Sequence, residues 1–449
     1  MAKRISISGG RVIDPGAGLD AVSDVMIADG RIAAVGSSRE SSSDGADLII
    51  DAAGMIVCPG FIDLHCHLRE PGGESKETIE SGTLAAARGG FTTVCAMPNT
   101  NPPIDSASMI DFIREKADVE GAVRVLPVGC ITKGRVGLEV VDIGAMAAAG
   151  AVALSDDGNA VTDSNVMRQA LEAAYECGIT VVEHCEDESL SAGGVMNEGE
   201  IANRLGLKGI PETAEEIIVA RDLSLSEMTG GHVHIAHAST YGTVYLLRRA
   251  RASGFAVTAE VTPHHLMLTE ERVASSKSGA GYDTNAKVNP PLRTERDVRA
   301  LIDGLAEGVI NAIATDHAPH TVADKDCDFE SAAFGISGLE TALGSVMALV
   351  HRGDIDLNTL ISKLTYEPSM AFPRIRELAG GEVGTLNIGA PADVVIFDPD
   401  AEWTVDPAQF ASKGKNTPIA GERLKGRVMV TVCGGEIVYK DDGIVVRKA

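Results

Sequence analysis

The sequence has few aromatic residues, few positive charges and no long apolar run. Phe, Trp and Tyr make up 4% of its 449 residues, so aliphatic side chains must fill the core. Its 39 basic residues are outnumbered by 64 acidic ones. The resulting charge of −25 argues against sequence-independent binding to nucleic acid, which needs Lys and Arg against phosphates, and it disfavours anionic membranes. No stretch reaches the ~18 consecutive apolar residues of a spanning helix.

Targeting and cysteine signals are equally sparse. The opening MAKRISISGG has two basic residues but no apolar core after them, so it does not predict a signal peptide. The eight cysteines are scattered and form no CxxC pair, and most stand in apolar surroundings, as reduced thiols do in the cytosol. We therefore expect a soluble, cytoplasmic, globular protein.

Both ends of the chain are rich in short β-strand patterns. Residues 1–55 contain three β-branched, apolar runs separated by Gly, Pro or Asp-Gly, and residues 385–449 have the same character. Residues 56–384 follow a different sequence pattern. We expect the two ends to build one small composite β domain beside a larger central domain.

In the central part, short apolar strands alternate with helix-like segments. Eight strands are expected at 61–67, 91–97, 123–132, 151–157, 179–185, 232–237, 256–262 and 310–316, with helical patterns such as 164–178 and 243–254 between most of them. This alternation implies a parallel sheet, and eight strands match a TIM barrel. The predicted fold is α/β, a TIM (β/α)8 barrel with a small β-sandwich domain built from both chain ends. A doubly wound open sheet is the alternative, but no GxGxxG follows the first strand.

Ten of the eleven histidines fall between residues 65 and 320, at strand ends. His65 and His67 stand two apart in FIDLHCH, so both side chains point to one face, at the carboxyl end where barrel enzymes place their sites. A lone strand histidine is more often structural. Two histidines within reach of one ion favour a metal.

Further candidate ligands end other strands. His184 ends the fifth strand, His237 the sixth and Asp316 the eighth. Imidazole and carboxylate together suit zinc, with manganese or cobalt as alternatives. His232 and His234 have the opposite strand parity to His237, so we expect them to face away from the site.

The fourth strand ends in SDDG, which contains Asp156 and Asp157. Two acids before a glycine fit a simple turn as well as they fit a site. At a strand end of this barrel, one of them is a candidate bridge between two metals. Such a bridge holds two cations ~3.5–4 Å apart, where they acidify a shared water.

The run from Phe61 to Ser106, with HxHxRxPG followed by MPNTxPPxDS, strongly resembles the dihydroorotases of the long, class I type in the amidohydrolase superfamily. The resemblance continues through SDDG, VVEHC, HIAHAST, EVTPHHLMLTEE, VNPPLR, ATDHAPH and FGISGLETA, and so covers nearly the whole chain. The first two motifs are typical of the dihydroorotase, allantoinase and hydantoinase branch. FGISGLETA with NPPLR points further towards dihydroorotase.

The resemblance implies six metal ligands, which are His65 and His67 for the first ion, His184 and His237 for the second, Asp157 as the bridge and Asp316 on the first ion. Spacing to His184 favours Asp157 over Asp156 as the bridging acid. Hydantoinases, allantoinases and shorter dihydroorotases commonly carry a carboxylated lysine there. No lysine lies near residue 157, and class I dihydroorotases have the same substitution.

The resemblance also implies seven substrate-binding residues, namely His67, Arg69, Asn99, Asn289, His320, Phe334 and Gly335. Arg69 and Asn99 would hold the substrate's carboxylate with help from His320, because a guanidinium fork suits a carboxylate. A surface salt bridge with Glu70 or Glu74 is the alternative for Arg69.

The implied activity is that of a dihydroorotase: zinc-dependent, reversible cyclisation of N-carbamoyl-L-aspartate to L-dihydroorotate in de novo pyrimidine (UMP) biosynthesis. One or two zinc ions per subunit are expected, preferably two. In hydrolysis a metal-bound hydroxide would attack the ring carbonyl, and Asp316 would act as catalytic acid/base, passing the proton to the leaving nitrogen.

Two other functions stay open. One is an allantoinase or hydantoinase type of cyclic amidohydrolase. The other is a non-catalytic dihydroorotase-like scaffold for aspartate transcarbamoylase, although every ligand type is retained. The expected partners are a small-molecule substrate and further copies of the chain in a homo-oligomer, a dimer, with neither nucleic acid nor membrane. Whether an active enzyme also associates with aspartate transcarbamoylase is left open.

Overall fold

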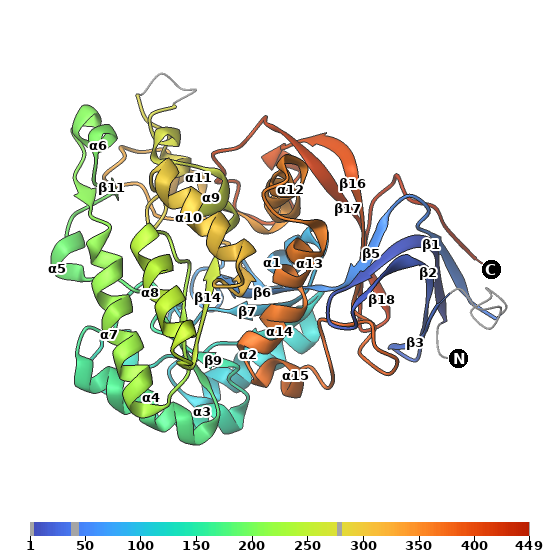
Figure 1. Cartoon of the computed structure of the whole chain (residues 1–449), viewed down its shortest axis with the longest axis horizontal. Helices are drawn as coiled ribbons and strands as arrows, with labels where there is room; N and C mark the ends of the chain where they lie inside the picture. Colours follow the sequence, from blue (N-terminus) through green and yellow to red (C-terminus); the bar gives the residue numbers. More distant parts are fainter. Residues whose placement is uncertain (1–3, 37–44, 276–280, 449) are drawn as a thin grey trace.

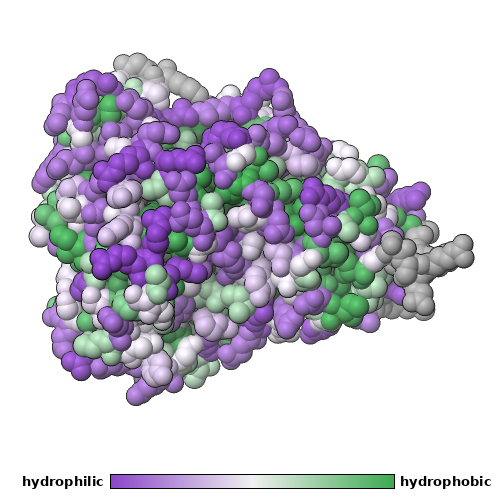
Figure 2. Space-filling model, viewed as in Figure 1, coloured by the Kyte–Doolittle hydropathy of each residue, from purple (hydrophilic) through white to green (hydrophobic). Residues whose placement is uncertain are grey.

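The computed structural model describes residues 4–36, 45–275 and 281–448. Strands surrounded by helices make up one part of the molecule, at the left of Figure 1, and a β-sheet containing both chain ends makes up the other. The surface in Figure 2 is mostly polar over the helices, and apolar groups are more visible toward the sheet.

Eight of the parallel strands described in the central part belong to one ring. Two parallel sheets hold them, β6 (Phe61–Cys66), β7 (Phe91–Ala96) and β8 (Arg124–Pro127) in one, and β9 (Ala153–Leu154), β10 (Thr180–Glu183), β13 (Val233–Ile235), β14 (Val257–Val261) and β15 (Ala312–Ile313) in the other. Parallel bridges Gly129↔Leu154 and Cys66↔His317 join the two sheets at both edges. The eight strands therefore follow one another in a closed ring. Each lies within a predicted strand, and the predicted α/β class is confirmed.

Helices follow most of the ring strands. The longer ones are α1 (Ile79–Gly89), α2 (Ala107–Glu120), α3 (Ile143–Ala149), α4 (Ser164–Cys177), α7 (Thr213–Thr229), α8 (Tyr241–Ala252), α10 (Glu295–Ala306), α12 (Ala342–Arg352) and α13 (Leu357–Leu364). Shorter elements are α5 (Glu188–Ser191), β11 (Met196–Asn197), α6 (Glu200–Leu205), β12 (Gly209–Ile210), α9 (Pro263–Met267), α11 (Val322–Lys325), α14 (Tyr366–Ala371) and α15 (Arg374–Leu378). The predicted helical patterns at 164–178 and 243–254 correspond to α4 and α8.

Local signals explain where α4 begins and ends. The Asp163 side chain accepts hydrogen bonds from the first backbone N–H groups, and Gly178 takes the left-handed conformation that ends the helix. Between them, Val166, Ala170 and Ala174 recur at helical spacing on the buried face. This face packs against the ring.

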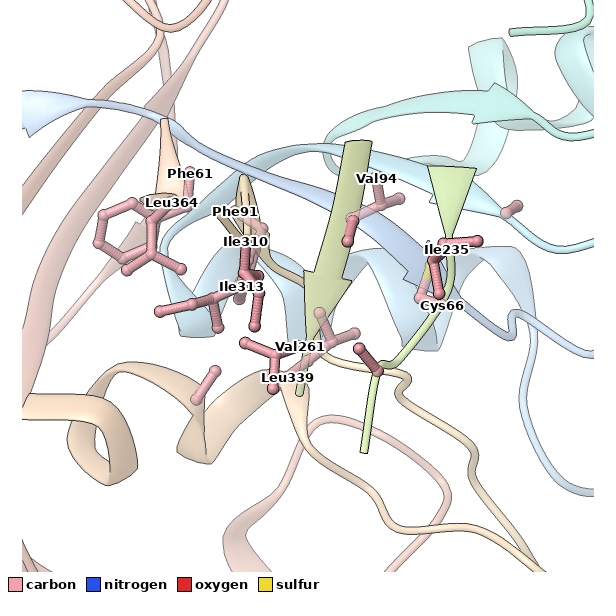
Figure 3. Close-up of a cluster of buried hydrophobic side chains, with 14 of the residues drawn as sticks. Phe61, Cys66, Phe91, Val94, Ile235, Val261, Ile310, Ile313, Leu339 and Leu364 are labelled. Atoms are coloured by element: carbon pink, nitrogen blue, oxygen red, sulfur yellow. The ribbon is translucent and has the colours of Figure 1, made fainter. Parts of the chain in front are cut away.

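Two apolar layers fix the ring. Figure 3 shows the outer layer, in which side chains of the strands such as Val94, Ile235 and Ile313 pack beneath the helices. Their neighbours along the strands, such as Cys95 and Ala312, belong to a different buried cluster that fills the inside. Because both faces are packed, the carboxyl ends of the strands are held in fixed positions.

Strands from the two chain ends form a separate nine-stranded sheet. It contains β1 (Ile5–Asp14), β2 (Leu19–Ala28), β3 (Arg31–Gly36), β4 (Leu48–Asp51), β5 (Ile56–Pro59), β16 (Val394–Thr404), β17 (Arg423–Cys433), β18 (Glu436–Lys440) and β19 (Val446–Lys448). Antiparallel pairing of β5 with β16 joins the two ends of the chain. The sheet reaches Pro59, four residues past the predicted boundary at 55. The domain boundaries themselves stay a prediction.

Within the described ranges, the helices are all too short or too polar to cross a membrane.

Candidate metal centre and substrate pocket

The six predicted metal ligands meet at the carboxyl end of the ring. Each lies in or just after a ring strand, His65 and His67 with β6, Asp157 after β9, His184 after β10, His237 after β13 and Asp316 after β15. Each exposes at most 5% of its surface. The structure thus brings together all the acids and imidazoles that the sequence placed on five different strands.

Asp157 lies in the middle of this cluster. Its carboxylate is within 4 Å of one nitrogen of each histidine, 3.3 Å from Nε2 of His65, 3.6 Å from Nε2 of His67, 3.7 Å from Nδ1 of His184 and 3.6 Å from Nε2 of His237. A carboxylate in this position can reach ions on both sides of it.

The neighbouring acid, Asp156, is turned away. Its Oδ1 accepts hydrogen bonds from the backbone N–H groups of Ile131 and Thr132, at 2.9 and 3.0 Å, and the Thr132 hydroxyl donates to its other oxygen. Asp156 therefore holds the preceding loop, and of the two acids only Asp157 lies among the histidines.

Asp316 is on the side of the first two histidines. Its Oδ1 lies 3.0 Å from Nε2 of His67 and 3.6 Å from Nε2 of His65. Two sets of three residues are close enough to share an ion, His65 with His67 and Asp316, and His65 with Asp157 and His237.

These residues pass a test of fit to a divalent cation. Nε2 of His65 and Nδ1 of His237 are buried and have no hydrogen-bond partner in the described ranges. A buried polar atom without a partner costs about 1–3 kcal/mol. A cation among the imidazoles and carboxylates would supply a partner for Nε2 of His65, which lies 3.3 Å from Asp157. His237 faces Asp157 with its other nitrogen, Nε2. This mixture of nitrogen and oxygen donors is one that zinc accepts.

Both acids are held ionised. Burial alone would raise the pKa of Asp157, but the charge of His65 and hydrogen bonds with His184 and His237 bring it well below its usual range. Burial likewise opposes ionisation of Asp316, and its hydrogen bond with His67 and the charge of His65 lower its pKa. Ionised carboxylates can bind a cation or accept a proton.

Backbone strain is concentrated at this end of the ring. Five described non-glycine residues have a positive φ, and three of them are Arg69 (+60°), His237 (+32°) and Asp316 (+44°). The left-handed region is costly for residues with a Cβ, and such strain persists where the surrounding structure enforces it. Here it turns the side chains that follow β6, β13 and β15.

The strain at His237 corrects one sequence prediction. We expected His232 and His234 to face away from the site because their strand parity is opposite to that of His237. Instead, His234 lies inside the ring and its Nε2 is 3.2 Å from Glu260. Alternation breaks down because the positive φ of His237 turns its side chain out of the strand pattern.

A second layer of acceptors surrounds the histidines. Nδ1 of His65 lies 2.7 Å from Oε1 of Glu260, and Nδ1 of His67 lies 2.8 Å from Oδ1 of Asn99. Nε2 of His184 lies 3.0 Å from Oε2 of Glu186. Neither glutamate was predicted from the sequence, although a charged residue inside the apolar strand β14 was a usable signal for Glu260.

Glu260 is ionised despite its burial. Desolvation would raise its pKa, but the charge of His65 and hydrogen bonds from His234 and His65 bring it to about 2. It is therefore an acceptor only, with one oxygen for each of two imidazoles.

A cavity of about 160 Å³ opens beside the cluster. It is lined by six of the seven residues predicted to bind substrate and by five of the six candidate ligands, with His67 in both groups, and by three small or apolar neighbours. The predicted residues that line it are His67, Arg69, Asn99, Asp157, His184, His237, Asn289, Asp316, Phe334 and Gly335. His65 lies beneath it, and His320 lies behind its wall.

Arg69 lines one side of this cavity, and His320 lies behind it. The Arg69 Nε donates to the carbonyl of Pro319 at 3.3 Å, and no carboxylate of the described chain lies within ion-pair distance of its guanidinium. Glu70 instead pairs with Lys116 at 3.2 Å. The salt-bridge alternative is therefore not seen, and the guanidinium is available to an anion in the cavity.

His320 supports this wall. Its Nε2 lies 2.8 Å from the carbonyl oxygen of Phe334. Burial and the charge of Arg69 lower its pKa to about 3, so the ring is neutral. In this geometry His320 fixes the Phe334–Gly335 backbone beside Arg69 and does not itself line the cavity.

The family model described as Dihydro-orotase-like matches residues 54–242 of the chain. Among curated proteins, the chain is similar to the dihydroorotase of Pelotomaculum thermopropionicum, with 51% identity over 439 residues that cover 98% of this chain and 99% of the relative. The dihydroorotase of Anaeromyxobacter sp. (strain K) is 49% identical over 441 residues, with the same shares covered.

Solved structures also match the whole chain. The L-hydantoinase (dihydropyrimidinase) of Arthrobacter aurescens has a TM-score of 0.86 at 25% identity, covering 100% of this chain and 98% of its own. The dihydropyrimidinase of Brevibacillus agri NCHU1002 has a TM-score of 0.82 at 22% identity and covers 99% and 96%. The fold is thus shared with these proteins, while sequence identity is about twice as high to the dihydroorotases.

Proposed function

The chain belongs to the dihydroorotases of the amidohydrolase superfamily, and on that premise we propose that it interconverts N-carbamoyl-L-aspartate and L-dihydroorotate at the cavity beside the histidine cluster. It is a hydrolase that acts on the carbon–nitrogen bond of a cyclic amide. One observation carries the assignment of the site: a cationic guanidinium and a cluster of metal-ligand types line the same 160 Å³ cavity.

We propose that the closed ring is a TIM barrel and that the sheet of the two chain ends belongs to a small β-sandwich domain. The domain division at residues 1–55 with 385–449, and 56–384, remains part of this proposal. It is supported by the joining of β5 to β16 and by a separate apolar cluster within that sheet. The site then lies at the carboxyl end of the barrel strands, where such enzymes place their chemistry.

The proposed cofactor is zinc, with two ions per subunit. His65, His67 and Asp316 would hold the first, His184 and His237 the second, and Asp157 would bridge them. When bound, such ions acidify water and polarise a carbonyl oxygen. The support is the donor set and the partnerless Nε2 of His65, which faces Asp157.

Asp316 is the proposed proton carrier. In ring closure its carboxylate accepts the proton of the attacking carbamoyl nitrogen and returns it to the oxygen that leaves the side-chain carboxyl group as water. In hydrolysis the same carboxylate takes a proton from water and gives it to the ring nitrogen. Its ionised state and its place at the cavity wall suit this role.

Four other groups would bind and orient the substrate. Arg69 and Asn99 would hold the carboxylate, since the Arg69 guanidinium has no ion-pair partner in the described chain. Asn289 and the Phe334–Gly335 backbone would contact the ring. His320, predicted to help with the carboxylate, is proposed to act by fixing the Phe334 carbonyl.

Hydantoinase activity is the rival within the same fold, because the matched solved structures include hydantoinases. Hydantoin lacks the carboxylate for which Arg69 would be used. The discriminating experiment measures zinc content together with turnover of L-dihydroorotate, hydantoin and allantoin by the purified protein. We expect dihydroorotate turnover that depends on zinc; preference for hydantoin or allantoin would refute the assignment, and no turnover by zinc-loaded protein would favour the scaffold alternative.

Biological context completes the proposal. We place the reaction in de novo pyrimidine biosynthesis and in the cytoplasm; the support for the location is eight cysteines, none of them in a disulfide. The proposed assembly is a homodimer. Association with aspartate transcarbamoylase is not part of this proposal. Nucleic acid and membranes are not proposed as partners, in keeping with the charge of −25.

A further inference from the structure

A fully buried carboxylate lies next to the cluster of candidate metal ligands. Glu260, in β14, has no exposed surface, and its two oxygens contact two different histidines. Oε1 lies 2.7 Å from Nδ1 of His65, and Oε2 lies 3.2 Å from Nε2 of His234. It does not line the cavity, so it is out of reach of the substrate.

The first contact fixes the tautomer of His65. A carboxylate only accepts hydrogen bonds, so Nδ1 of His65 must carry the proton that lies between the two groups. When His65 gives up its second proton to bind a cation, Nε2 is therefore the nitrogen that offers its lone pair. That nitrogen is the one with no hydrogen-bond partner in the described chain, and it lies 3.3 Å from Asp157 and 3.6 Å from Asp316.

The second contact fixes Glu260 itself. Nε2 of His234 donates to it, and Nδ1 of His234 lies 2.7 Å from the hydroxyl of Thr258, which can donate. The same hydroxyl lies 3.0 Å from Nε2 of His232, whose Nδ1 is 3.0 Å from the Thr180 hydroxyl. A single assignment of protons satisfies every hydrogen bond in this series.

Burial makes this series of hydrogen bonds rigid. His234 exposes no surface, and its ring packs edge-on against Phe372 with centroids 5.0 Å apart. Neither oxygen of Glu260 can turn away without leaving a buried imidazole N–H unpaired, which costs about 1–3 kcal/mol. The Glu260 carboxylate is therefore held between His65 and His234.

We infer that Glu260 is a positioning residue for the first metal: clamped by His234, it holds His65 as the tautomer whose Nε2 lone pair points into the ligand cluster. The inference rests on the proposed function of His65 as a ligand. Outer acceptors of this kind typically contribute 10–100-fold to metal affinity, because they fix both tautomer and ring orientation.

The test measures zinc affinity, independent of turnover. Apo protein is titrated with zinc in competition with a chromophoric chelator, which resolves the first and second ions. We expect Glu260→Leu, which removes the acceptor, to weaken the first ion about 10–100-fold. Glu260→Gln keeps an oxygen acceptor for His65 but loses the charge, so its affinity should lie between those of the Glu260→Leu variant and wild type.

Glu340→Gln is the matched control. Glu340 is a glutamate whose side chain is only 7% exposed; it pairs with Arg88 at 3.3 Å and accepts hydrogen bonds from the backbone of Ala411 and Ser412, at 3.0 and 3.2 Å. It contacts no proposed ligand, so its zinc affinities should equal those of wild type. Wild-type affinity of the first ion in folded Glu260→Gln and Glu260→Leu would overturn the inference.

Two further measurements keep the outcomes distinct. If Glu260→Leu does not fold, nitrogen-15 spectra of the zinc-loaded wild type decide the question, because His65 must carry its proton on Nδ1; a proton on Nε2 overturns the inference. His65→Ala tests the underlying function. Loss of the first ion there with unchanged Glu260 variants overturns only the positioning role, whereas retention of that ion overturns the proposed metal site as well.

Discussion

The terminal sheet and the carboxyl end of the ring are both deeply buried, but they are built from opposite kinds of side chain. In the sheet, residues such as Ile5, Val12, Ile396 and Val430 are fully buried aliphatic groups that contact one another. At the ring end, the buried groups are carboxylates and imidazoles. The sheet removes apolar surface from water, whereas the ring end removes charge from water.

The difference shows which region stabilises the protein and which performs its chemistry. Burying an aliphatic side chain contributes about 1.5–3 kcal/mol. The ring end carries partnerless nitrogens on His65 and His237 and left-handed backbone at His237 and Asp316, all of which oppose folding. Substitutions should therefore lower stability in the sheet and lower activity at the ring end.

The largest expected effect tests the ring end. Asp316→Asn should depress kcat about 10²–10⁴-fold, because the amide cannot carry the proton that moves during the reaction. Thermal stability should fall little or rise. The measurement is steady-state kinetics with zinc content determined on the same sample. A near-normal kcat with zinc in place would assign the proton transfer to another group.

The next effect tests the sheet. Ile396 in β16 lies between Val57 of β5 and Val430 of β17, so Ile396→Ala leaves a cavity where the two chain ends join. We expect a loss of about 2–5 kcal/mol in the free energy of unfolding, with kcat unchanged while the protein is folded. Denaturant unfolding gives the value.

An exposed residue of the same sheet provides its control. Val22 in β2 is 69% exposed, so Val22→Ala should change the free energy of unfolding by no more than about 0.5 kcal/mol. Equal losses for both variants, or a loss of kcat in folded Ile396→Ala protein, would contradict the separation of roles.

The contrast between the regions also explains what the sequence could predict. Strand alternation and the HxH spacing follow from local periodicity, and they located all eight ring strands and the neighbourhood of His65 and His67. The contact between Glu260 and His234 was not predicted for a different reason. It depends on the pairing of β13 with β14, and the side of His234 was judged from His237, whose left-handed backbone breaks the strand alternation.

A smaller effect separates binding from chemistry within the ring end. Arg69 would contact a carboxylate that is present in both ground and transition states, so Arg69→Met should mainly raise KM for dihydroorotate. A charge-assisted, bidentate contact is worth about 2–3 kcal/mol, or roughly 30–150-fold. Arg69→Lys keeps the charge without the fork and should give a smaller increase. A fall in kcat with unchanged KM would instead place Arg69 among the groups that act only in the transition state.

The last prediction is that the rate does not change, and it concerns the acid between the two proposed ions. A bridging carboxylated lysine would need carbon dioxide, whereas the Asp157 carboxylate is part of the chain. The lining of the 160 Å³ cavity includes Asp157 and contains no lysine among the described residues. Removing carbon dioxide from zinc-loaded enzyme and then adding bicarbonate should therefore leave the rate unchanged at both steps. Activity restored by bicarbonate would mean that a carbamate forms on a lysine from elsewhere, and Asp157 would lose the bridging role that its position among four histidines suggests.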